Sequence, residues 1–312
     1  MNKSFAAAIL FLGCVAFCLC QAGGRGNVEQ NDYREEMDRL YDQNLKKWPV
    51  PYRVRFADTR YGKTHVIESG PENGFPVILL HPFGFNGTIW EEAVADLCRH
   101  GFRTLCVDTI GDMGRSSLES PQRFPKNAKD YCDWLEDLCR SFKLTSAHFI
   151  GHSMGGWIAN AMAIFKPGYV EKLVLLAPAA GIPEKIEWQK FLQYLIVDPT
   201  EENRKKMVRF LLGDGRAYEK WSAYFFLALH RRDALVTPPF PFSDEQLKTI
   251  TAPVLLMAGD REVVWSNIDD TFARGRRLVP SLRAVKIPAA GHALTVDQPE
   301  LVNEEILVFL EK

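Results

Sequence analysis

Strand-sized apolar runs alternate with helix-sized segments over most of this chain, and that alternation limits its possible folds more than any other feature. The runs Pro76–Leu80, Ala147–Gly151 and Val254–Met257 are almost continuously apolar, which is typical of strands covered on both faces. Segments of helical length and pattern separate them. The pattern predicts an α/β fold with a mostly parallel central sheet and helices on both faces.

The same reasoning places the remaining elements of the sheet domain. Further strands are expected at Tyr52–Phe56, Thr64–Glu68, Phe102–Val107, Leu173–Leu176 and Leu282–Ile287. Further helices are expected at Tyr33–Leu45, Thr88–Arg99, Asn127–Phe142, Trp157–Phe165 and Pro299–Leu310.

The alternation breaks between Leu176 and Val254, where the pattern predicts three consecutive helices. They are expected at Glu184–Ile196, Thr200–Leu212 and Tyr218–His230. We interpret residues 182–250, approximately, as a helical cap inserted into a single domain that spans residues 23–312. The rest of the domain, outside this cap, is called the body. Most aromatic side chains of the cap should pack against the body, and a few should line an apolar pocket. These aromatic residues are Trp188, Phe191, Tyr194, Phe210, Trp221, Tyr224, Phe225 and Phe226.

The N-terminus has the layout of a secretory signal peptide. A short basic start at Met1–Lys3 precedes the uncharged apolar run Phe5–Cys20, and small residues follow from Ala22. The run is short for a membrane span, which needs about 20 residues, although an uncut anchor is the alternative. We expect residues 1–22 to be removed and the protein to be secreted or to reside in the lumen of the secretory pathway.

Four cysteines remain after such a cleavage, namely Cys98, Cys106, Cys132 and Cys139. An oxidising compartment permits disulfides. Cys132 and Cys139 are expected on one helix, where they would lie about 10 Å apart, too far for a bridge. Four buried thiols are therefore the favoured interpretation, with disulfides left open.

One glycosylation sequon, Asn86-Gly87-Thr88, is present after residue 22. A glycan on Asn86 is one hypothesis. The alternative is that Thr88 caps the following helix and that the site is too close to the pocket to be modified.

Gly151–Gly155 fits the pattern G-x-S-x-G, and it lies between an expected strand and an expected helix. This context favours a sharp turn that carries a nucleophilic serine, Ser153, at the helix N-terminus. The two flanking glycines are needed because larger side chains would clash in such a turn. A serine hydroxyl also requires a base, and His292 follows the last expected strand by five residues.

A carboxylate should orient the base, and two acids compete for this role. They are Asp260 and Glu262, in the loop after Val254–Met257.

An oxyanion hole needs two backbone donors. Met154 supplies one, and Phe83 is expected to supply the other, because Pro82 has no N–H. Most of the remaining histidines, and the loop Asp108–Ser116, are interpreted as structural. These histidines are His65, His81, His100, His148, His152 and His230.

Taken together, these motifs resemble the α/β-hydrolase family in its cap-bearing, esterase-like branch, from about Tyr61 to Leu310. Pro82 departs from the glycine that many relatives carry there. The resemblance favours Glu262 as the acid, three residues after Gly259, with Asp260 as the alternative. It implies a serine hydrolase that cleaves an apolar acyl or aryl ester through an acyl-enzyme, without a cofactor or a metal.

The same residues leave other functions open. A thioester, amide, lactone or carbon–carbon bond could be hydrolysed by the same three side chains, and a ligand-binding or receptor-like relative could retain them. The expected partner is a small ester-like molecule. Nucleic acid is not an expected partner, because the formal net charge is −1 and we find no basic cluster. The oligomeric state is not predicted.

Overall fold

The structure is a computed structural model that describes residues 27–230 and 237–312. The expected signal peptide, residues 1–22, lies outside the described residues. Among the described residues, no helix combines the length and the apolar character that a membrane span requires.

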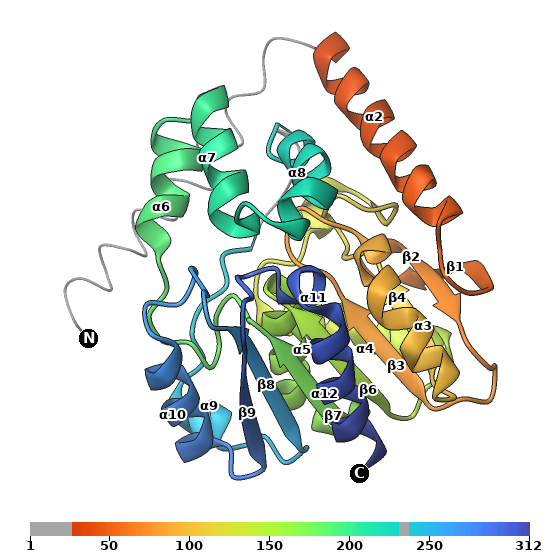
Figure 1. The fold of residues 1–312 in the computed structure, drawn as a ribbon. Helices are drawn as coiled ribbons and strands as arrows, with labels where there is room; N and C mark the ends of the chain where they lie inside the picture. The colour runs from red at the N-terminus through yellow and green to blue at the C-terminus, as the bar shows by residue number, and fades with distance from the viewer. Residues whose placement is uncertain (1–26, 231–236) are drawn as a thin grey trace.

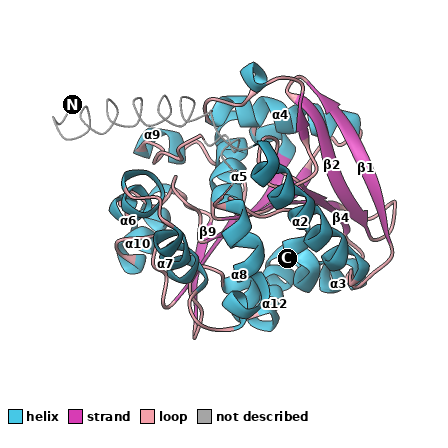
Figure 2. Cartoon of the chain, turned by 90° about the horizontal axis from the view of Figure 1, so that it is seen from above, coloured by secondary structure: helices cyan, strands magenta, loops and turns pink. Residues whose placement is uncertain are grey.

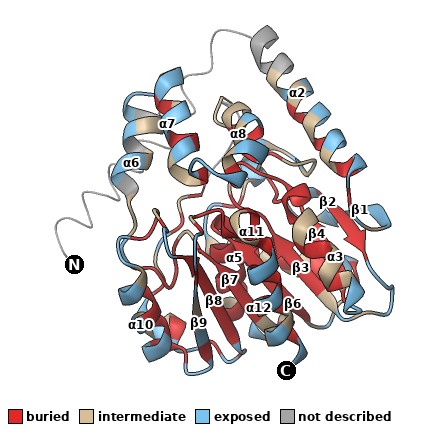
Figure 3. Ribbon diagram, viewed as in Figure 1, coloured by how far each residue is buried: buried red, intermediate tan, exposed pale blue. Residues whose placement is uncertain are grey.

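A nine-stranded sheet forms the centre of the domain, in the order β1-β2-β4-β3-β6-β7-β8-β9, with β5 paired to β2 off this path. Along this order, the strands from β4 to β9 pair in parallel, whereas β2 pairs antiparallel with β1, β4 and β5. The strands are β1 (Tyr52–Thr59), β2 (Gly62–Ser69), β3 (Pro76–Leu80), β4 (Arg103–Val107), β5 (Ser117–Leu118), β6 (Ala147–His152), β7 (Val170–Leu176), β8 (Val254–Gly259) and β9 (Leu282–Ile287). The predicted α/β fold class is confirmed, and Figure 3 shows the central strands as the buried layer.

Helices cover both faces of the sheet (Figure 2). Helix α3 packs with α12 on one face, and α4 packs with α5 on the other. The helices are α2 (Asn27–Lys46), α3 (Glu91–Arg99), α4 (Ala128–Ser141), α5 (Met154–Phe165), α6 (Trp188–Leu192), α7 (Glu201–Leu212), α8 (Arg216–Ala228), α9 (Asp244–Leu247), α10 (Ile268–Leu278), α11 (Leu294–Asp297) and α12 (Pro299–Glu311). Short 3-10 turns lie at Gly87–Trp90 (η1), Pro121–Arg123 (η2) and Pro167–Tyr169 (η3).

Helices α6, α7 and α8 lie together beyond one end of the sheet, between β7 and β8 in sequence (Figure 1). The helix expected from Glu184 begins only at Trp188 and then widens into a π-helical turn, Gln193–Val197. Its first residues pair with the body instead. Ile186 bridges Trp265, and the N–H of Glu187 donates to Val264 O at 2.9 Å. These bonds commit the backbone of Ile186 and Glu187 to the loop after β8, so the helix starts only after them.

Arg274 of α10 binds both ends of this helical insertion. Its guanidinium donates to the carbonyls of Gly181 and Ile182, at 3.0 and 2.6 Å, where the chain leaves the body. It also donates to Phe242 O and to Asp244, both at 2.9 Å, where the chain returns. One nearly buried cation thus joins the two connections of the cap.

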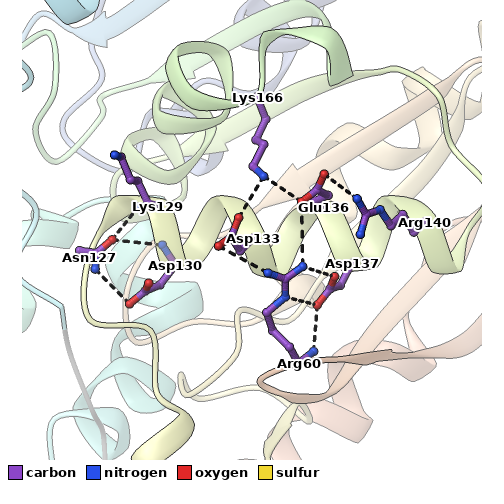
Figure 4. Close-up of polar contacts among 9 residues, drawn as sticks. All are labelled: Arg60, Asn127, Lys129, Asp130, Asp133, Glu136, Asp137, Arg140 and Lys166. Atoms are coloured by element: carbon purple, nitrogen blue, oxygen red, sulfur yellow. Dashed lines mark hydrogen bonds and ion pairs between the residues drawn. The ribbon is translucent and has the colours of Figure 1, made fainter.

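The β1–β2 hairpin is attached to α4 by charged side chains (Figure 4). Arg60, at the hairpin turn, pairs with Asp137 at 2.8 Å and with Asp133 at 3.5 Å. Lys166, after α5, reaches Asp133 and Glu136 of the same helix at 3.0 and 2.8 Å. This network lies on the body, apart from the cap.

Helix α2 runs beside α8 and is anchored to the body by Tyr41 (Figure 1). The Tyr41 hydroxyl donates to the fully buried carboxylate of Asp108 at 3.1 Å. That carboxylate also accepts the N–H groups of Gly87 and Arg115, both at 2.7 Å. The predicted structural role of the loop Asp108–Ser116 agrees with these bonds.

The four cysteines of the described residues are thiols. Cys106, Cys132 and Cys139 are buried, but Cys98 is only half-buried, so the expectation of four buried thiols is wrong for that residue. Cys132 and Cys139 share α4, as expected.

The glycosylation hypothesis for Asn86 is contradicted by its burial. Asn86 is 0% exposed and its side chain accepts the N–H of Thr88 at 2.8 Å, so the folded chain has no room for a glycan there. The alternative is also corrected, because Asn86 rather than Thr88 caps the 3-10 turn that follows.

Candidate active site

Ser153 stands between β6 and α5 with φ 51° and ψ −113°, a positive φ that is uncommon for any residue with a side chain. The conformation is held by backbone bonds on both sides. Its N–H donates to Leu176 O at 2.9 Å, and its carbonyl accepts the N–H groups of Trp157 and Ala179. The predicted sharp turn between strand and helix is therefore present at this serine.

The glycines two residues before and after Ser153 are required by close backbone contacts. A Cβ on Gly151 would lie 2.2 Å from Gly155 O, and a Cβ on Gly155 would lie 2.1 Å from Leu80 O. No side chain fits at those distances, which gives the G-x-S-x-G pattern its physical reason.

Three predicted side chains meet at this turn from loops far apart in sequence. His292 Nε2 lies 2.9 Å from Ser153 Oγ. His292 Nδ1 lies 2.9 Å from each carboxylate oxygen of Glu262. The Glu262 carboxylate is fully buried and also accepts the N–H of Val264 at 2.7 Å, which fixes its orientation. The three residues form one continuous hydrogen-bonded chain.

Asp260, the alternative acid, does not reach His292. Its carboxylate accepts the N–H of Ala290 at 3.3 Å and faces the Arg261 side chain at 3.7 Å. Glu262 lies two residues further along the loop, past the point where β8 ends. Of the two candidates, the structure brings only Glu262 to the imidazole.

His152 is a contact that the sequence analysis missed. Its Nε2 donates to the carbonyl oxygen of His292 at 2.8 Å, and the two rings lie 5.5 Å apart. Burial, reinforced by the nearby His292, lowers the pKa of His152 to about 3, so the ring is neutral. The signal available in the sequence was only its place next to Ser153.

The turn after β3 approaches the same site. The N–H groups of Phe83 and Met154 make no hydrogen bond within the described residues, which leaves both available as donors. His81 is structural, as expected: its Nδ1 donates to Pro82 O at 2.8 Å, and its Nε2 accepts from the N–H of Thr109 at 2.9 Å.

Helix α8 of the cap packs on this turn. Phe225 stacks on Phe85 with ring centroids 5.0 Å apart, and Trp221 meets the same ring edge-on at 5.6 Å. Trp221, Tyr224 and Phe225 are buried, in agreement with the expectation that most cap aromatics pack against the body. The side chain of Trp188 lies outside the described residues.

The arrangement has the parts needed for acyl transfer. A hydroxyl contacts an imidazole whose far nitrogen contacts a buried carboxylate, and two backbone donors lie on adjoining turns. Within residues 27–230 and 237–312, no group of three or more His, Cys, Asp or Glu side chains could hold a metal ion.

Comparison with known proteins defines the class. A sequence profile of the Alpha/beta hydrolase family matches residues 77–305, and the chain belongs to this family. It is similar to carboxylesterase YbfK of Bacillus subtilis (strain 168), with 32% identity over 281 residues that cover 87% of this chain and 92% of that protein.

Solved structures of carboxylesterases are also similar to this chain. The crystal structure of carboxylesterase CesB (YbfK) from Bacillus subtilis matches with a TM-score of 0.81 and 29% identity, over 89% of this chain and 98% of that chain. The crystal structure of naproxen esterase (carboxylesterase NP) from Bacillus subtilis matches with a TM-score of 0.78 and 30% identity, over 88% and 96% of the two chains.

Proposed function

We propose that this protein is a carboxylic ester hydrolase in which Ser153 is the nucleophile, His292 the base and Glu262 the acid. The observation that carries the proposal is the continuous chain of 2.9 Å contacts from Ser153 Oγ through His292 to Glu262. The similarity to carboxylesterases supports the same activity.

The reaction follows from the positions of these groups. Ser153 Oγ attacks the ester carbonyl while His292 Nε2 takes its proton, and Glu262 stabilises the imidazolium. The N–H groups of Phe83 and Met154 bind the negative oxygen of the tetrahedral intermediate. The imidazolium then protonates the leaving alcohol. Water, deprotonated by His292, releases the acid and restores Ser153.

The substrate we propose is an ester with an apolar acyl or aryl group. The aromatic side chains that α8 contributes beside the turn after β3 favour an apolar ligand over a highly charged one. A relative named naproxen esterase supports this substrate class.

A fluorophosphonate probe followed by peptide mass spectrometry tests the nucleophile. We expect labelling at Ser153 in the unaltered protein and none in Ser153→Ala, whose ester hydrolysis should fall by about 10⁴-fold or more. A Ser153→Ala protein that keeps near-normal turnover would refute the assignment. Labelling without hydrolysis of any p-nitrophenyl ester would favour an amide, thioester, lactone or carbon–carbon bond as the scissile bond.

We further propose secretion with cleavage near Ala22, on the basis of the apolar run Phe5–Cys20. Expression in a eukaryotic secretion host and intact-mass measurement test this. An intact Met1 in the secreted or cell-associated protein would overturn the proposal.

A further inference from the structure

The turn expected to carry the oxyanion donor Phe83 is bonded to a second turn by the residue that follows it. Gly84 has φ +78°, a conformation suited to glycine, and its N–H points to the carboxylate of Asp112. The two carboxylate oxygens lie 3.1 and 3.3 Å from the Gly84 nitrogen. Because Phe83 and Gly84 share a peptide unit, this bond restricts the rotation of the backbone next to the Phe83 N–H.

Asp112 is itself held in place. It lies in the loop after β4, and its Oδ1 also accepts the N–H of Met113 at 2.8 Å. Its side chain is only 9% exposed and approaches His81, the first residue of the turn after β3, at 3.9 Å. A carboxylate held at this depth sets a definite position for the groups that bind it.

The loop that carries Asp112 is bonded in turn to the cap. The hydroxyl of Tyr224, on α8, donates to Met113 O at 2.8 Å. The neighbouring Phe225 packs directly on Gly84, since a Cβ there would lie 2.7 Å from Phe225 Cε2. The cap helix therefore touches the turn after β3 both directly and through Met113.

We propose that Asp112 is a positioning residue for the oxyanion hole, and that Tyr224 connects it to the cap. This inference rests on the proposed esterase function. Asp112 acts through the backbone of Gly84 and touches no reacting atom. From the sequence, the loop Asp108–Ser116 that contains it was expected to have only a structural role.

The Asp112 carboxylate contributes by fixing the position of the backbone at Gly84, and not by its negative charge. A negative charge near a developing oxyanion raises the energy of the intermediate, so the charge cannot be the beneficial feature. An asparagine keeps an oxygen that accepts from Gly84 and Met113. Asp112→Asn should therefore preserve the function of the residue, and Asp112→Ala should remove it.

The test compares Asp112→Ala, Asp112→Asn and Tyr224→Phe with the unaltered protein. For each, kcat and KM for a p-nitrophenyl ester, the rate of fluorophosphonate labelling and the inhibition constant of the product acid are measured. Arg60→Gln is the matched control. It weakens the ion-pair network on α4, away from the site, and should lower thermal stability while leaving kcat unchanged.

The expected result for Asp112→Ala is a fall of about 10- to 100-fold in kcat and in the labelling rate. KM and the product inhibition constant should stay within about twofold, because ground-state binding does not use the oxyanion donors. Asp112→Asn should recover kcat to within about threefold, and Tyr224→Phe should lose about 3- to 10-fold.

Normal kcat in folded Asp112→Ala overturns the proposal, as does an Asp112→Asn protein that is as impaired as the alanine variant. If Asp112→Ala does not fold, Tyr224→Phe decides: unchanged kcat overturns the link to the cap, and a loss in kcat at constant KM supports it. Failure of the unaltered protein to label at Ser153 would count against the proposed function instead.

Discussion

His152 Nε2 lies 2.8 Å from the carbonyl oxygen of His292, so the residue before the candidate nucleophile holds the backbone of the candidate base. His152 must be neutral and carry its proton on Nε2 to make this bond. Because the same imidazole is buried, its protonation is linked both to the stability of the fold and to the position of His292.

The first prediction concerns stability against pH. The pKa of His152 is lowered to about 3, chiefly by burial, whereas an unfolded histidine titrates near 6.5. Between these values the unfolded chain binds one more proton, so stability is full above the unfolded pKa and falls as the pH falls. His152→Gln should flatten the plot of unfolding free energy against pH by up to about 1.4 kcal/mol per pH unit near pH 5.

His148→Gln provides the control for that measurement. Burial lowers the pKa of His148 to about 4, so this variant should flatten the same plot, yet it makes no contact with the site. Urea unfolding midpoints between pH 7 and pH 4 give the slopes. We expect kcat at pH 8 to fall in His152→Gln and to stay normal in His148→Gln; equal activity in both would contradict the positional role of His152.

The second prediction ranks the two acids. Glu262→Gln should lower kcat by roughly 10³- to 10⁴-fold, because the imidazole loses its charged partner and its preferred tautomer. Asp260→Asn should change kcat by less than about threefold, since the Asp260 carboxylate faces Ala290 and Arg261 rather than His292. Steady-state kinetics of the purified, folded variants make the comparison. The reverse order would refute the assignment of Glu262 as the acid.

The third prediction concerns the connections of the cap. Arg274→Met removes four hydrogen bonds from a side chain that is 10% exposed, and it should destabilise the protein by about 2–4 kcal/mol. Faster limited proteolysis between β7 and β8 should accompany that loss. Arg277→Met is the matched control, because Arg277 pairs with the same Asp244 but is 61% exposed, and it should change stability by less than about 1 kcal/mol.

The fourth prediction concerns helix α2. Tyr41→Phe leaves the buried Asp108 carboxylate without one of its donors, so the free energy of unfolding should fall by about 1–3 kcal/mol. Arg39→Gln, which breaks only an exposed pair within the same helix, should have no measurable effect. Denaturant unfolding of both variants measures the difference. Equal stabilities would indicate that α2 is held by its apolar contacts alone.

Much of the fold could be predicted because the buried strands are short and almost purely apolar. Pro76–Leu80 has the expected bounds, and so has the less buried and less apolar strand Leu282–Ile287, because turn residues flank both. β1 and β2 extend beyond the predicted ends because their pairing continues through polar residues such as Asp58 and Lys63. The periodicity of apolar residues in the sequence cannot reveal backbone hydrogen bonds between strand ends that consist of polar residues. The start of α6 was misplaced for a similar reason, because Ile186 bridges Trp265 on a loop distant in sequence.

The residues of the candidate site divide in the same way. The sequence by itself determined the sharp turn at Ser153, because only glycines can stand at positions 151 and 155 when backbone carbonyls lie about 2 Å from their missing Cβ atoms. Gly151 meets the carbonyl of Gly155, four residues along the chain, whereas Gly155 meets that of Leu80 on β3. The pattern can therefore be recognised in five consecutive residues, although one of its two close contacts is tertiary.

Only the tertiary structure decided the contacts between residues distant in sequence. It placed His152 against the His292 carbonyl and bonded Asp112 to Gly84. Of the two candidate acids, it brought to His292 the one that the resemblance had favoured, Glu262. Each of these bonds joins two loops whose separation depends on how the strands pack and where the helices lie. A hydrogen bond forms only within a few tenths of an ångström of its ideal length, so residue type and spacing alone cannot select the partner.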